Sequence, residues 1–391
     1  MSFKAQIKEL AKQIGFDQVG ITRPGALEEG ENAIRDWVRE GKHGTMRYLE
    51  EFEARRERFF NDFPDAKSVI VLGVNYFTGQ GAGGRGQGER LAGRVARYAW
   101  GKDYHKVIRK KHEALIEQLR QIVGSRGDPR HSFRAKSCVD TQPLPERYAA
   151  RKAGLGFIGK HTGLLSREFG PWLFLSEIVT NLELEEDLPA AGDCGACNYC
   201  QKVCPTGALD QDYKIDARLC IAYLTIEHKG VIPRELRPKI KDWIFGCDEC
   251  LNICPFGSKL SIHPDPDELT WPEFLPESGF GSQLDIGEFF EIRSNREYQK
   301  RFAETALSRT TRKQMLRNAC IVLGNSGRAE ALPYLKKALK DASSLVRLHA
   351  AWALGRLDME EARKILEQHH ETDPEVLEEV RLAGQKTGAI V

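Results

Sequence analysis

The hydrophobic positions of residues 3–15 recur every three or four residues, which is the spacing of one face of a helix. Phe3, Ile7 and Leu10 lie on this face, and Gly15 follows as a residue suited to ending the helix. Shorter apolar runs at 18–21, 66–76 and 172–181 predict strands. Because helix and strand signals alternate up to about residue 181, the pattern predicts an α/β or α+β domain.

The same pattern continues through the middle of this predicted domain. Residues 133–140 predict a strand that ends at Asp140-Thr-Gln-Pro143, and residues 145–153 predict the helix that follows. Gly154 suits the left-handed position after a helix. The glycines of Gly154-Leu-Gly-Phe-Ile-Gly-Lys-His-Thr162 predict a turn whose backbone comes close to a flat or bulky group.

The last quarter of the chain repeats itself. Asn318-Ala-Cys-Ile-Val-Leu-Gly324 and His349-Ala-Ala-Trp-Ala-Leu-Gly355 are related by a shift of 31 residues. A repeat of this length and composition predicts helical hairpins of the HEAT type from about residue 309. Residues 258–290, rich in proline and glycine, predict an irregular connector before them.

Eight of the ten cysteines lie in a short part of the chain, mostly in two runs. The first run reads C-x2-C-x2-C-x3-C-P, the spacing of bacterial ferredoxins, in which the fourth cysteine ligates the other cluster. The second run has one cysteine fewer, and Cys220 can supply it. We therefore predict two 4Fe–4S clusters with crossed ligands: cluster one is held by Cys194, Cys197, Cys200 and Cys254, and cluster two by Cys204, Cys220, Cys247 and Cys250.

Two other uses of these cysteines fit the sequence less well. Paired C-x2-C motifs also bind zinc, but a run ending in Cys-Pro, given twice, favours paired clusters. Disulfides are disfavoured because the cysteines cluster together and the first residues do not resemble a signal peptide. Cys138 and Cys320, outside the cluster set, are expected to be core thiols.

Length, charge and hydropathy limit the number of domains and the class of protein, but they do not indicate a particular reaction. The chain has 391 residues, enough for two or three domains, and a net charge of +2. It contains no apolar run long enough to span a membrane, so we expect a cytoplasmic protein without a membrane segment. The predicted division is an α/β domain at 1–189, a ferredoxin-like domain at 190–257, a connector at 258–308 and repeats at 309–391.

Local charge is less even than the total. Residues 94–112 hold seven Lys or Arg against one Asp, with aromatic residues interleaved, and residues 301–340 hold nine against two acids. Either stretch could contact RNA phosphates, and either could be the solvated face of a helix. In the second stretch, the hypothesis of an RNA-docking face rests on Arg312, Lys313 and Arg317.

Several motifs then carry a resemblance along nearly the whole chain. They are Arg97-Tyr-Ala-Trp-Gly-Lys-Asp-Tyr-His105, Asp140-Thr-Gln-Pro-Leu-Pro-Glu-Arg147, the turn 154–162, the two cysteine runs with Cys220-Ile-Ala-Tyr-Leu-Thr-Ile-Glu227 between them, and the HEAT tail. In this order they resemble the epoxyqueuosine reductases. The resemblance implies an α+β protein with an N-terminal α/β cobalamin-binding domain, an inserted two-cluster domain and C-terminal all-α repeats. It also implies reduction of epoxyqueuosine to queuosine at the wobble position of tRNA.

The resemblance also implies roles for particular residues. Asp140 is the implied general acid, although an aspartate in Asp-Thr-Gln-Pro could equally cap the turn. The implied cobalamin contacts are Arg56, Arg97, Tyr98, Lys160 and His161, for which solvated loops and core aromatics are the alternatives. His105 is not assigned to cobalt, because Ile108 replaces the glycine of the Asp-x-His-x-x-Gly cobalamin motif.

The implied partners are the anticodon loop of a tRNA and an external electron donor such as a flavodoxin or ferredoxin system. We expect a monomer. Two other functions are compatible with the same motifs. One is a corrinoid and iron–sulfur reductase that acts on a small molecule. The other is a non-catalytic two-cluster electron-transfer protein with a HEAT docking scaffold.

Overall fold

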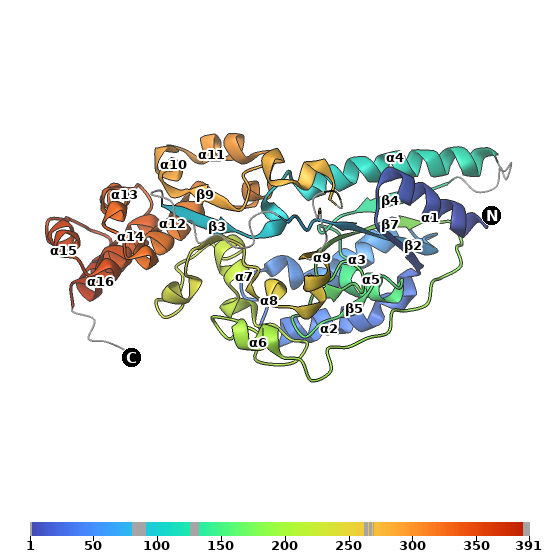
Figure 1. The fold of residues 1–391 in the computed structure, drawn as a ribbon, viewed down its shortest axis with the longest axis horizontal. Helices are drawn as coiled ribbons and strands as arrows, with labels where there is room; N and C mark the ends of the chain where they lie inside the picture. The colour runs from blue at the N-terminus through green and yellow to red at the C-terminus, as the bar shows by residue number, and fades with distance from the viewer. Residues whose placement is uncertain are drawn as a thin grey trace. The chain divides into compact units, whose positions relative to one another are not determined.

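The structure is a computed structural model that describes residues 2–79, 91–125, 133–261, 265, 268 and 270–385. It divides into two compact units. Unit 1 comprises Met1–Ala82, Lys102–Ala217 and Glu249–Ser278. Unit 2 comprises Gly83–Gly101, Arg218–Asp248 and Gly279–Val391. Figure 1 traces both units from the N-terminus in blue to the C-terminus in red.

A four-stranded antiparallel sheet forms the centre of unit 1, in the order β1-β2-β7-β4. Its strands are β1 (Gln18–Thr22), β2 (Ser68–Asn75), β7 (Leu173–Thr180) and β4 (Ala135–Cys138). Every residue of β2 is buried, as expected for a central strand that is covered on both faces. All four elements confirm strands predicted from the apolar runs.

Helices cover both faces of this sheet. Figure 1 shows α1 (Phe3–Ile14) and α4 (Tyr104–Ser125) along one face, and α2 (Glu28–Arg39), α3 (Phe52–Asn61) and α5 (Glu146–Lys152) along the other. The predicted first helix is confirmed with its caps. The Ser2 hydroxyl accepts the N–H of Ala5 at 3.2 Å, and Gly15 ends the helix with a φ of 110°.

The remaining elements of unit 1 are short. A hairpin of β5 (Phe157–Ile158) and β6 (Leu164–Leu165) follows α5. The helices α6 (Tyr199–Val203) and α8 (Glu249–Asn252) lie in the two cysteine runs, and α9 (Ser258–Ser261) follows the second run. Gly154 has a φ of 86°, which confirms its expected left-handed position after α5.

Unit 2 contains a second sheet assembled from three distant segments. Its order is β8-β3-β9, from β8 (Trp243–Phe245), β3 (Ala92–Val95) and β9 (Gln283–Asp285). β3 runs parallel to β8 and antiparallel to β9. The chain is therefore grouped differently from the four consecutive domains predicted, since strands from three of those segments form one sheet.

The predicted irregular connector is wrong in its second half. Residues 258–290 were expected to be irregular, yet they include β9 and most of α10 (Ile286–Glu291), and α11 (Asn295–Phe302) follows. Ile286, Phe289 and Phe290 are buried. Helix α10 is only six residues long, which is too short to give a periodic signal in the sequence. Its buried side chains stabilise it through tertiary packing.

The HEAT prediction is confirmed by five helices: α12 (Arg312–Ser326), α13 (Leu332–Ala338), α14 (Ser344–Leu357), α15 (Glu360–Glu367) and α16 (Pro374–Gly384). The equivalent residues Cys320 and Ala351 are both fully buried, so Cys320 is the core thiol that was predicted. A Cβ at Gly324 would stand 2.8 Å from the Cα of Ala353, so the close packing of α12 on α14 requires glycine there.

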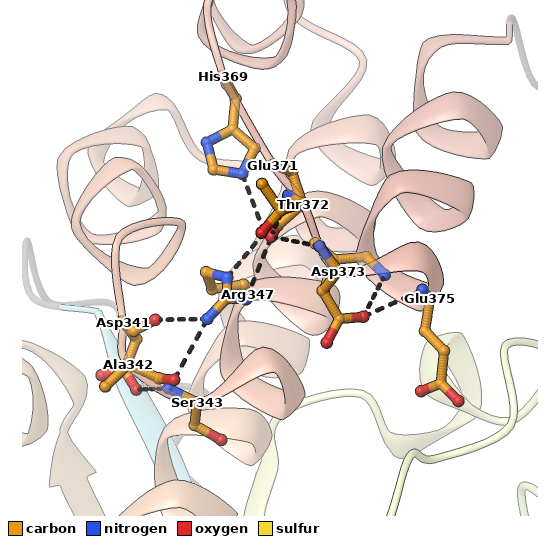
Figure 2. A network of polar contacts seen from close by, with 10 residues as sticks. Asp341, Ala342, Ser343, Arg347, His369, Glu371, Thr372, Asp373 and Glu375 are labelled. Carbon is orange, nitrogen blue, oxygen red and sulfur yellow. Dashed lines mark hydrogen bonds and ion pairs between the residues drawn. The ribbon is translucent and has the colours of Figure 1, made fainter.

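An arginine and a glutamate connect consecutive repeat helices (Figure 2). Arg347, at the start of α14, binds both carboxylate oxygens of Glu371 at 2.7 and 3.2 Å. Its Nη1 also donates to the carbonyl of Asp341 at 2.9 Å. Hydrogen bonds from Arg347 lower the pKa of Glu371 to about 2. The pair is bidentate, which fixes the loop between α15 and α16.

One sequence hypothesis about the repeats is wrong in part. Arg317 was placed on a basic docking face, but its side chain is fully buried. Its guanidinium donates to the carbonyls of Leu224, His228 and Gly230 at 2.7–2.8 Å. Arg317 therefore ties α12 to the end of α7 (Ile221–Ile226) within unit 2 and is out of reach of RNA. Arg312 pairs with Asp341 at 2.7 Å, and Lys313 is exposed.

A search for membrane-spanning segments gave a negative result. Over the residues that the structure describes, no helix combines the length and the apolar character needed to cross a bilayer.

Candidate iron–sulfur and acid–base sites

The four cysteines predicted to hold cluster one all lie in unit 1 and lie near one another. Cys194 and Cys254 pack against the same apolar group, which includes Phe157 and Leu165. Burial raises the pKa of Cys200, and the neighbouring thiols of Cys194 and Cys197 raise it further. Burial likewise raises the pKa of Cys254, with Cys194 and Cys200 adding to it. Cys254, more than fifty positions along the chain, therefore lies close to the cysteines of the first run.

Local backbone structure explains how the cysteines are presented. The N–H of Cys197 donates to the carbonyl of Cys194 at 3.0 Å, and Gly195 between them has a φ of 51°. Both Cys204 and Cys254 precede a proline and are extended, with ψ values of 113° and 123°. Proline disfavours the helical conformation in the residue before it, so each Cys-Pro pair turns the chain out of its helix.

The cysteines predicted for cluster two are divided between the units. Cys204 and Cys250 belong to unit 1, and Cys220 and Cys247 to unit 2. Cys220 is the N-cap residue of α7. Cys247 follows β8, where the N–H of Gly246 donates to the hydroxyl of Thr225 at 2.9 Å. Among the described residues, no three His, Cys, Asp or Glu side chains converge on one metal ion; the thiolates of a cube bind different iron atoms.

The glycine-rich turn between β5 and β6 lies against Cys194, a predicted ligand of cluster one. The N–H of Lys160 donates to the Sγ of Cys194 at 3.4 Å, and its ammonium pairs with Asp212 at 3.0 Å. The Nδ1 of His161 accepts the N–H of Gly163 at 3.0 Å, so a neutral imidazole carries its proton on Nε2. Burial lowers the pKa of His161 to about 4.

The Nε2 of His161 has no hydrogen-bond partner among the described residues, although it is buried. A buried donor without an acceptor costs about 1–3 kcal/mol. Such a group is explained most simply by a ligand that brings the missing acceptor. Of the five predicted cofactor contacts, His161 is therefore the one whose surroundings point most directly to a bound ligand.

The other three predicted contacts have protein partners. Arg56, on α3, pairs with Glu31 at 2.6 Å and lines an open cavity of about 330 Å³. Arg97 and Tyr98 lie in unit 2. The guanidinium of Arg97 stacks over Trp100 at 4.3 Å, and the Tyr98 ring lies 6.2 Å from that of Phe245.

Asp140 lies two residues after the end of β4, in a left-handed conformation with a φ of 56°. Its Oδ2 lies 3.1 Å from the Nε2 of His105, and the Nδ1 of His105 lies 2.8 Å from the Oδ1 of Asp103. Burial disfavours the charged imidazole, but Asp103 and Asp140 outweigh it, so the pKa of His105 is raised. Asp103, His105 and Asp140 thus form a chain along which a proton can be passed.

The sequence analysis singled out Asp140 as a candidate but not the two residues that the structure links to it, His105 directly and Asp103 through His105. His105 was considered only as a cobalt ligand and rejected. The signal that could have found it is the spacing of Asp103 and His105 at the start of α4, where the N–H of His105 also donates to Asp103 at 3.1 Å. The pairing of His105 with Asp140 is tertiary and leaves no trace in the sequence.

Three parts of the chain match models of known protein families. A family model for a 4Fe–4S double cluster binding domain matches residues 193–257, and one for HEAT repeats matches 302–384. The model described as epoxyqueuosine reductase QueG matches residues 56–141. Together with the acid–base chain, the matches to a double-cluster domain and to helical repeats define an iron–sulfur oxidoreductase.

Relatives along the whole chain narrow this class. An epoxyqueuosine reductase of Xanthomonas campestris is 37% identical over 358 residues, covering 90% of this chain and 95% of its own. One of Lactococcus garvieae is 34% identical, covering 91% and 97%. The chain therefore belongs to the epoxyqueuosine reductase family, whose members are oxidoreductases.

Solved structures of this family have the same fold. An epoxyqueuosine reductase with an epoxyqueuosine-modified tRNA-Tyr stem loop has a TM-score of 0.82 and 31% identity, and covers 99% of both chains. A Bacillus subtilis epoxyqueuosine reductase, with its catalytic aspartate loop swung out of the active site, has a TM-score of 0.83 and 29% identity over 98% of both chains.

Proposed function

We propose that this protein reduces epoxyqueuosine to queuosine at the wobble position of a tRNA. The observation that carries the proposal is the match along 99% of both chains to a reductase solved with an epoxyqueuosine-modified stem loop. The Asp103–His105–Asp140 chain supplies the acid–base group that such a reduction needs. A modified wobble base lies in a single-stranded loop, where proteins recognise unstacked bases.

The chemistry sets the requirements. Opening the epoxide and releasing its oxygen as water, to leave a cyclopentene, consumes two electrons and two protons. Each 4Fe–4S cluster passes one electron at a time, so two clusters form a path from an external donor. We assign cluster one to Cys194, Cys197, Cys200 and Cys254, and cluster two to Cys204, Cys220, Cys247 and Cys250. The proximity of Cys194, Cys200 and Cys254 supports the first assignment.

The turn at 159–163 fits a corrinoid. Lys160 links this turn to Cys194, and His161 offers a buried N–H without an acceptor, which suits an amide oxygen at the edge of a corrin ring. When bound, cobalamin would supply the reducing centre next to the epoxide. Lys160 and His161 would hold it, and Arg56, Arg97 and Tyr98 remain proposed contacts.

Asp140 is proposed as the general acid that protonates the oxygen leaving the epoxide carbon. A group in this role must hold a proton near neutral pH. His105 lies within hydrogen-bonding distance and can return a proton to Asp140 after each transfer, while Asp103 orients the imidazole. Two protons are needed in each turnover, and Asp140 and His105 together can hold two.

The partners follow from the same scheme. They are the tRNA anticodon loop and an electron donor of the flavodoxin or ferredoxin type. We propose a cytoplasmic monomer. Within the repeats, Lys313 is the residue of the predicted basic set that is exposed, so it is the better candidate for a phosphate contact.

The direct test is a product assay. Protein reconstituted with iron, sulfide and cobalamin is incubated with a reductant and a tRNA stem loop that carries epoxyqueuosine. We expect nucleoside mass spectrometry to detect queuosine, which is lighter by one oxygen atom, and no change in a stem loop with unmodified guanosine.

Other outcomes would favour the alternatives. Turnover of halogenated organic compounds without tRNA conversion would favour a small-molecule reductase. Bound iron and sulfide, with neither cobalamin binding nor conversion of any substrate, would favour an electron-transfer protein.

A further inference from the structure

A glutamate occupies the middle of the central sheet of unit 1. Glu177, on β7, is fully buried and lies opposite Val71 of β2 and Cys138 of β4. Val71 and Cys138 belong to the apolar core packed under α5, which contributes Ala149 and Ala150. Neither carboxylate oxygen of Glu177 accepts a hydrogen bond from an N–H or hydroxyl group of the described residues. An ionised carboxylate in such a place is costly, so its presence requires an explanation.

A second carboxyl interacts with Glu177. Glu146, the first residue of α5, lies within hydrogen-bonding range of Glu177. The Oε1 of Glu146 also accepts the backbone N–H of Asp140 at 2.5 Å. Burial raises the pKa of both glutamates, and the nearby carboxyl of Asp140 raises them further. The two glutamates therefore lie directly behind the proposed general acid.

Two carboxyl groups in apolar surroundings cannot both ionise, and one must carry a proton to hydrogen-bond to the other. The pair then holds one proton and one negative charge. The charged groups that the described residues place around the pair are His105 on α4 and its partner Asp103, Arg147 on α5, Lys136 on β4 and Arg55, which reaches the Asp140 loop from α3. From β2 the pair is faced by apolar Val71.

We propose that Glu146 and Glu177 are positioning residues that share one proton, and that their single negative charge keeps a proton on Asp140. This inference rests on the proposed function of Asp140 as the general acid. His105, on the opposite side, favours the ionised form of Asp140 when it is charged, and the glutamate pair offsets that effect. Glu146 also fixes the left-handed backbone of Asp140 by accepting its N–H.

The test separates charge from shape. In Glu146→Gln the amide oxygen can still accept the Asp140 N–H, but Glu177 becomes neutral and the negative charge is lost. A nearby negative charge raises the pKa of an acid, and a general acid works only while protonated. The alkaline limb of the pH profile of the single-turnover rate should therefore move to lower pH by on the order of one pH unit. At pH values above this limb, the rate should be about tenfold lower than in the wild type.

Glu177→Gln is the complementary variant. Its amide can donate to Glu146, which stays ionised, so the charge is retained and the rate near neutral pH should change by less than about threefold. The shared proton is lost, so an infrared band of a buried protonated carboxyl, present in the wild type, should disappear. Asp17→Asn is the control, because Asp17 is another part-buried carboxyl with a pKa raised by burial to about 6, before β1.

Three results bear on the proposal in different ways. A shifted limb in Glu146→Gln together with loss of the infrared band in Glu177→Gln supports it. A Glu146→Gln profile that superimposes on an active wild type, or a wild type without the band, overturns it. A loaded wild-type protein that converts no tRNA would defeat the proposed function instead, and the infrared comparison would still decide whether the pair shares a proton.

Discussion

Replacing Asp140 by asparagine is expected to reduce turnover of the tRNA substrate by about 10²–10⁴-fold, the usual contribution of a positioned acid or base. Asparagine is nearly the same size and tolerates left-handed backbone, so the φ of 56° at this position can be kept. Its amide can still face His105. The variant should therefore bind iron, sulfide and cobalamin as the wild type does and fail in proton transfer alone.

The control for this variant is Asp358→Asn. Asp358 is also a left-handed aspartate, with a φ of 51° after α14, and it lies in the repeats. The same chemical change in the same backbone conformation should leave turnover within about twofold, since surface substitutions usually cost little. Wild-type turnover by Asp140→Asn would remove Asp140 from the mechanism.

The second large effect is expected at Cys254. If Cys254 ligates cluster one as we propose, Cys254→Ala removes one corner ligand of that cluster, and the protein should lose about four of its eight iron atoms and nearly all turnover. Cys320→Ala is the matched control, because Cys320 is a fully buried cysteine outside the cluster set. It should keep full iron content, although the small cavity it leaves can lower stability.

A double variant tests the crossed arrangement itself. If Cys194 and Cys254 hold the same cluster, Cys194→Ala with Cys254→Ala removes only that cluster, and about four iron atoms remain. If each run instead ligated its own cluster, the double variant would lose both. Iron analysis with the spectrum of the reduced protein separates the two outcomes.

Much of unit 1 could be predicted because its signals are local. The apolar run of β2 and the helical spacing from Phe3 to Ile14 each lie within one stretch of chain, and the structure contains both elements. The cysteine runs are equally local, since their spacing alone matches a known cluster motif. The cluster ligands, however, remain predictions that the iron measurements will test.

The features that escaped prediction are those made by distant contacts. The sheet of β3, β8 and β9 uses strands of three or four residues, too short for a periodic signal. Arg317 carries a charged side chain of a type that is usually exposed, and only its hydrogen bonds to backbone carbonyls explain its burial. Glu177 also escaped prediction. It interrupts an apolar strand, and its proposed role depends on Glu146, which only the fold brings beside it.

The central claim is that one chain carries both the two-cluster electron path and the corrinoid that the reduction needs. Its most direct test is metal analysis of the reconstituted protein, together with a visible spectrum. We predict about eight iron atoms and one cobalt per chain, with the absorption of both cofactors. Iron and sulfide at that level without cobalt, after incubation with cobalamin, would contradict the claim and leave a two-cluster electron-transfer protein.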